Sequence, residues 1–101
     1  MRGGDTLVRS LNFATREEEY QYELDRNDTH LMLLKVLAAD KPKIPGMDGM
    51  LKGHVDKAAA LRAQAEETSR SGDRAAAIEG LEASTRELVR AIRSLGVFIP
   101  G

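Results

Sequence analysis

Residues 78–95 read IEGLEASTRELVRAIRSL, and apolar or small side chains recur in them at steps of three and four residues. The positions with this spacing are Ile78, Leu81, Thr85, Leu88, Ile92 and Leu95. Such steps place side chains on one side of an α-helix, as in the a and d positions of a coiled-coil heptad. The pattern predicts a helix over residues 73–95 whose core positions are Leu81, Leu88 and Ile92.

The segment before this helix predicts its packing partner, a helix over residues 48–70 with Asp48 as its N-cap. The same spacing is kept there by Leu51, His54, Ala58, Leu61, Ala65 and Thr68. Gly72 suits the left-handed conformation that ends a helix, and Asp73 suits the N-cap of the next one. A connection this short predicts an antiparallel C-terminal hairpin.

The N-terminal part predicts two further helices, over residues 5–26 and 28–39. Thr15 and Glu18 have the spacing of a capping box, in which each side chain accepts a hydrogen bond from the backbone at the helix start. The cluster Asn27-Asp28-Thr29 is typical of a turn followed by an N-cap.

The segment 40–47 contains Pro42 and Pro45, which cannot continue a helix, and we expect it to form a crossover loop. The predicted fold is therefore all-α, a bundle of about four helices in a single domain that spans residues 1–101. Residues 1–4, with two glycines, are expected to be disordered or a vector-derived remnant.

The composition argues against several classes of partner. With 15 basic and 16 acidic residues among 101, the formal charge is −1, whereas a nucleic-acid or anionic-membrane surface is normally basic. No apolar run approaches the ~20 residues of a transmembrane helix. No signal peptide is visible, so the default expectation is the cytoplasm, and a processed exported domain stays open as the alternative.

Catalysis is also not indicated by the sequence. There is no cysteine, hence neither a disulfide nor a thiolate metal ligand. We find no strand-to-helix elbow around a serine and no phosphate-binding glycine loop. We therefore expect a non-enzymatic protein without a cofactor.

The predicted helix 28–39 is apolar nearly all round, interrupted by Lys35. A helix of this kind must be central in the fold or bury a second face against another chain. The C-terminal residues 97–99 are apolar as well. This surplus predicts an interaction or structural module that self-associates as a homodimer or binds a protein partner. The candidate apolar contact residues are Leu33, Val36, Leu37, Phe98 and Ile99.

A basic stripe adds to these candidates. Arg86, Arg90 and Arg93 follow one another at i, i+4 and i+7 on the predicted last helix. Guanidinium groups at this spacing can receive an acidic partner or a phosphate. The alternative is ion pairing within the bundle, for example with Glu82.

The alternative function is a small metal- or ligand-binding bundle. Met47, Met50 and His54 fall at i, i+3 and i+7, and thioether plus imidazole ligands suit copper. The first helix adds the carboxylates Glu17, Glu18, Glu19, Glu23 and Asp25. The Glu-x-x-His motif of di-metal bundles is missing. The competing interpretations are methionines that fill gaps in the core and a solvated acidic face.

Residues 61–81 resemble a single tetratricopeptide-type helical hairpin. Leu61 and Ala65 match packing positions of the first helix, Gly72-Asp73 matches the turn, and Ala77, Ile78 and Leu81 match the core of the second helix. Arg74 stands where such hairpins usually carry an aromatic residue, and there is no second repeat. The resemblance covers about a fifth of the chain and implies an interaction module.

Overall fold

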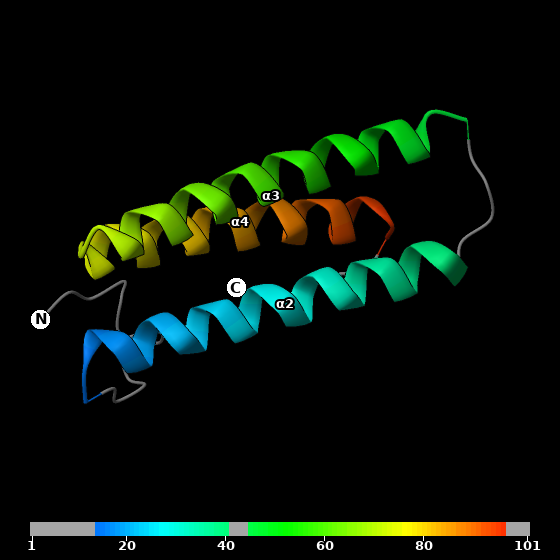
Figure 1. Cartoon of the computed structure of the whole chain (residues 1–101). Helices are drawn as coiled ribbons and strands as arrows, with labels where there is room; N and C mark the ends of the chain where they lie inside the picture. Colours follow the sequence, from blue (N-terminus) through cyan, green and yellow to red (C-terminus); the bar gives the residue numbers. More distant parts are fainter. Residues whose placement is uncertain (1–13, 41–44, 97–101) are drawn as a thin grey trace, which may run out of the picture.

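The computed structural model describes residues 14–40 and 45–96, which contain three helices (Figure 1). They are α2 (Arg16–Asp40), α3 (Met47–Arg70) and α4 (Arg74–Ser94). The described residues contain no strand, so the all-α prediction is confirmed, whereas the expected count of about four helices is not reached within these ranges. Residues 1–13, half of the predicted crossover loop (41–44 of 40–47) and the tail with Phe98 and Ile99 lie outside the described residues.

Helix α4 is the centre of the arrangement, because both other helices pack against it while α2 and α3 hardly contact each other. In Figure 1, α3 and α4 run side by side as an antiparallel pair, and α2 lies along the side of α4 that does not contact α3. The predicted seam of α4 is buried throughout, and Leu81, Leu88 and Ile92 are at most 1% exposed. The prediction of the core positions is therefore confirmed.

The turn of the C-terminal hairpin also forms as predicted. Gly72 has φ 105°. The Asp73 side chain accepts a hydrogen bond from the backbone N–H of Ala76 at 3.0 Å and so caps α4. The two helices approach closely at Gly80, where an added Cβ would lie 3.0 Å from the Cβ of Ala65. The absence of a side chain at Gly80 thus permits this close crossing.

The apolar core consists of two clusters at opposite ends of α4. At its N-terminal end, Ile78 and Leu81 pack with Ala65 of α3 and Tyr20 of α2. At its C-terminal end the cluster is formed by Leu34, Leu51, Ala58, Leu88, Ala91, Ile92 and Leu95. Each cluster contains residues from all three helices, so α2 belongs to the same folded unit as the hairpin.

The predicted turn at Asn27-Asp28-Thr29 is wrong, because these residues lie in the middle of the continuous helix α2. The predicted helices 5–26 and 28–39 are thus joined within the described residues. Asn27 is 3% exposed, and its amide is hydrogen-bonded to other helices. This tertiary bonding satisfies the polar group that would otherwise favour a turn or a cap.

The caps predicted at the starts of α2 and α3 have different outcomes. Thr15 does cap α2, since its hydroxyl accepts from the backbone N–H of Glu18 at 3.1 Å. Glu18 accepts in return from the backbone of Ala14 at 2.9 Å. Asp48 is not the N-cap of α3, because α3 begins at Met47 after Gly46, whose φ is 85°.

None of the helices in residues 14–40 and 45–96 is both long enough and apolar enough to span a membrane.

Candidate interaction surfaces

Helix α2 buries polar as well as apolar side chains against α4, and it also exposes large apolar side chains on its other face. The face towards α4 buries polar side chains, including Glu23 (1% exposed) and Asn27 (3%). The face away from α4 exposes large apolar side chains, which we call the outer stripe: Tyr22, Met32, Leu33 and Val36. An amphipathic helix of a monomeric domain normally places these two classes of residue the other way round.

The outer stripe is the largest exposed apolar feature of the described residues. Met32 is 66% exposed, Val36 57%, Tyr22 39% and Leu33 37%. On a helix with 100° per residue, these four positions fall within an arc of about 100°. Met32, Leu33 and Val36 therefore lie together on one side of α2, and Tyr22 lies on the same side, separated from them by the exposed residues Asp25 and Thr29.

The buried polar residues of α2 form a layer that ties the three helices together. The Asn27 amide donates to the Ser84 hydroxyl at 3.0 Å and to the Thr85 hydroxyl at 2.9 Å. Its carbonyl oxygen accepts from Arg62 of α3 at 3.1 Å. Ser84 in turn donates to the backbone oxygen of Ala58 at 2.7 Å. Because every member is bonded, this layer fixes the position of α2 along α4.

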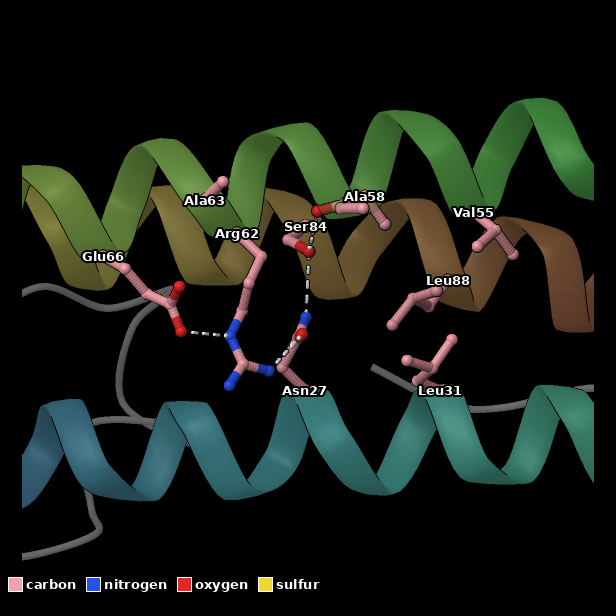
Figure 2. Close-up of a pocket in the computed structure, with 10 residues that line it drawn as sticks. Asn27, Leu31, Val55, Ala58, Arg62, Ala63, Glu66, Ser84 and Leu88 are labelled. Carbon is pink, nitrogen blue, oxygen red and sulfur yellow. Dashed lines mark hydrogen bonds and ion pairs between the residues drawn. The ribbon is translucent and has the colours of Figure 1, made fainter.

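Figure 2 shows this layer beside a groove of about 220 Å³ that lies between α2 and α3 over α4. Arg62 crosses the groove, bonding Glu66 at 3.1 Å and, on α2, Asp28 at 2.5 Å. The Arg62 guanidinium is thus engaged by its own neighbours, and the rest of the groove lining is mostly alanine and aliphatic side chains.

The predicted apolar contact residues have different positions. Leu33 and Val36 are in the outer stripe. Leu37 is half-buried and packs against the core cluster at the C-terminal end of α4. Tyr22 and Met32 were not among the predicted contact residues, although the all-round apolar character of the segment was the signal for Met32.

The three predicted arginines are exposed on α4 and surround a hollow of about 180 Å³. The structure adds a fourth, Arg26 of α2, which sequence spacing within α4 did not reveal. Thr85 and Val89, both buried, complete the lining. The hollow therefore combines two helices that are sixty residues apart in the chain only because α2 packs on α4.

Glu23 lies beside this hollow and is held by Arg26, with 3.4 Å between the guanidinium and the carboxylate oxygen. Burial raises the pKa of Glu23, and the attraction of Arg26 only partly opposes this effect. The neighbouring carboxylates of Glu82 and Glu19 raise the pKa further. The folded state thus favours the protonated form of Glu23 more than the unfolded chain does.

His54 is paired with a carboxylate that sequence analysis missed. Its Nδ1 lies 3.0 Å from Oε1 of Glu87, which is 5% exposed. Lys57 and Arg90 approach the other oxygen of Glu87 at 3.5 Å and 2.5 Å. The hydrogen bond from His54, followed by the attraction of Lys57 and Arg90, lowers the pKa of Glu87. No local pattern marks Glu87, because its partners come mainly from α3.

The other metal candidates have separate environments. Met47 is half-buried against the core, and Met50 is 41% exposed. Within the described residues, no three histidine, cysteine or acidic residues are grouped so that they could hold a metal ion.

The acidic residues of α2 are not a uniformly solvated face. Glu17 and Glu18 are exposed, and Glu17 forms an ion pair with Arg74. Glu19 and Glu23 are buried, at 8% and 1% exposure, so the interpretation as a solvated face is wrong for these two.

Comparisons of the chain with protein-family models, with curated proteins and with solved structures found no match.

Proposed function

We propose that the chain is a non-enzymatic helical interaction module whose copies associate through the outer stripe of α2. The observation that carries the proposal is that α2 exposes the large apolar side chains of the outer stripe in addition to its buried apolar contacts with α4. A fold gains little by turning Met32 and Val36 to water while it buries Glu23 and Asn27. The arrangement is explained if the outer face of α2 binds another copy of the chain while its inner face packs on α4.

Burial of the outer stripe against a second surface would favour association. Burying a Val, Leu or Met side chain fully contributes about 1.5–3 kcal/mol relative to leaving it exposed, and these partly exposed side chains would each gain the corresponding part of it. The three aliphatic residues of the stripe lie together on the C-terminal half of α2, with Tyr22 further along. A few residues, most often Trp, Tyr or Arg, usually supply most of an interface's affinity, and Tyr22 is the residue of this kind in the stripe.

A second copy of the chain is the occupant that the charges favour. The net charge of −1 means that two copies approach without appreciable long-range repulsion. Asp25 follows Tyr22 by three residues and Lys35 follows Met32 by three, so exposed charges of both signs adjoin the stripe on the helix surface. The surface therefore offers both signs of charge around an apolar centre and is able to complement itself in an isologous contact.

Native mass spectrometry and sedimentation velocity at micromolar concentration test this proposal. We expect a dimer for the natural chain and a monomer for the double variant Met32→Glu/Val36→Glu. The matched control is Ala60→Glu/Gln64→Glu, which adds the same charge at the same i, i+4 spacing on exposed positions of α3. A monomeric natural chain, or equal loss of the dimer in both variants, would refute the proposal.

A further inference from the structure

The arginine hollow is a separate surface on α4 and α2. Arg26, Arg86, Arg90 and Arg93 surround it, from two helices. Glu23 forms an ion pair with Arg26, and Glu87 forms one with Arg90.

Neither carboxylate balances its arginine fully. Glu87 is also bonded to His54 and approached by Lys57. Glu23 is 3.4 Å from Arg26, a long contact for an ion pair. Arg86 forms no ion pair with any residue in the described ranges, and it is exposed at the rim. The hollow therefore retains guanidinium donors that are available to an anion from solution.

We infer that this hollow binds a phosphoryl group. Guanidinium groups bind phosphate through paired N–H donors, and a doubly charged group with several oxygens can engage more than one arginine at once. Its volume, about 180 Å³, is below the roughly 300–1,000 Å³ of pockets that enclose a whole drug-sized ligand. The apolar floor at Val89 and the arginine rim thus suit a small anionic group.

The test is a ¹H–¹⁵N NMR titration of the full chain with inorganic phosphate at constant ionic strength, with chloride as the reference. We expect saturable shifts of the Arg side-chain Nε–H signals and of the backbone amides around Thr85–Arg93. The variants Arg86→Gln and Arg86→Gln/Arg90→Gln should weaken binding by about tenfold or more, since each removes charge-assisted hydrogen bonds.

The matched control is Arg70→Gln, which removes an exposed arginine at the far end of α3. It should leave phosphate binding unchanged. Shifts no larger than those caused by chloride, or equal weakening by the control, would overturn the inference. The backbone spectrum of each variant reports whether it is folded, so a folding defect is distinguished from a lost ligand.

Two sources of the phosphoryl group are separated by two further ligands, phosphoserine and a short peptide that contains phosphoserine. Equal affinity for both supports a free phosphate ester, and tighter binding of the peptide supports a phosphorylated segment of a partner protein. The Met32→Glu/Val36→Glu variant should bind phosphate as the natural chain does, so the inference is tested independently of self-association.

Discussion

The two sides of α4 are packed by different means. On the α3 side, a short capped turn and closely approaching small residues hold the hairpin together, as at Gly80 and Ala65. On the α2 side, apolar contacts at both ends flank a central polar layer around Asn27. The α3 side buries mainly apolar seam residues, whereas α2 buries carboxylates and an amide beside Tyr20 and Leu34 and leaves its outer stripe exposed.

This difference indicates separate roles for the two contacts. Apolar burial around α4 favours folding, because its free energy scales with the apolar area removed from water. The polar layer contributes less net free energy but penalises any shift of α2 along α4, since a shift would leave buried polar groups without partners. Helix α2 is thereby held with the outer stripe away from α4.

The largest expected effect comes from the seam of α4. Leu88→Ala removes a side chain that is 1% exposed and should lower the free energy of unfolding by about 2–5 kcal/mol, through lost apolar burial and a residual cavity. The matched control is Leu33→Ala in the outer stripe, where the same substitution should change it by about 0.5 kcal/mol or less. Urea denaturation of monomeric protein measures both, and equal losses would contradict the division between core and outer stripe.

The polar layer should give an intermediate effect. Asn27→Ala leaves the buried Thr85 hydroxyl without its donor and should lower the free energy of unfolding by about 1–3 kcal/mol. The neighbouring Asp28→Ala breaks an exposed ion pair with Arg62 and should cost about 1 kcal/mol or less. Thermal and urea unfolding check the pair, and an Asn27→Ala variant as stable as the natural chain would show that the layer does not hold α2.

The smallest effects concern the buried glutamates Glu23 and Glu87, whose pH dependence should have opposite signs. Since the pKa of Glu87 is lowered by His54, its stabilising contribution is present above the ordinary glutamate pKa and is lost as the pH falls through the lowered pKa. Since burial raises the pKa of Glu23, its contribution is present below the ordinary pKa and is lost as the pH rises through the raised pKa.

The variants Glu87→Gln and Glu23→Gln separate these two contributions. On acidification from neutral pH to about pH 4, the natural chain should lose stability relative to Glu87→Gln and gain stability relative to Glu23→Gln. We expect each relative change to be about 1 kcal/mol or less, because nearby solvent screens the charges. Urea midpoints at the two pH values measure it, and changes of the same sign would contradict the assignment.

The hairpin could be predicted from the sequence because its signals are local. The heptad seam from Ile78 to Leu95, Gly72 in the turn and the Asp73 cap each depend on residues within a few positions of one another. The continuity of α2 could not be predicted in the same way. Asn27-Asp28-Thr29 has local turn preference, and only the partners Ser84 and Thr85, almost sixty residues away, override it.

The candidate surfaces were partly predictable for the same reason. The apolar segment 28–39 indicated that this helix has a second contact face. Which side of the helix faces α4 depends on the packing of Leu34 and Asn27, which the sequence does not reveal. The arginines of α4 were visible as a stripe, whereas Arg26 joins them only through the register of α2 on α4. The tetratricopeptide-type resemblance and the self-association stay predictions.

The most direct test of self-association through the outer stripe is an isotope-filtered NOE experiment on a mixture of labelled and unlabelled natural chain. The account predicts intermolecular contacts from the methyl groups of Met32, Leu33 and Val36, and none from the exposed Ala60 of α3. A spectrum without intermolecular contacts at these three residues, recorded at a concentration where the chain is dimeric, would contradict it.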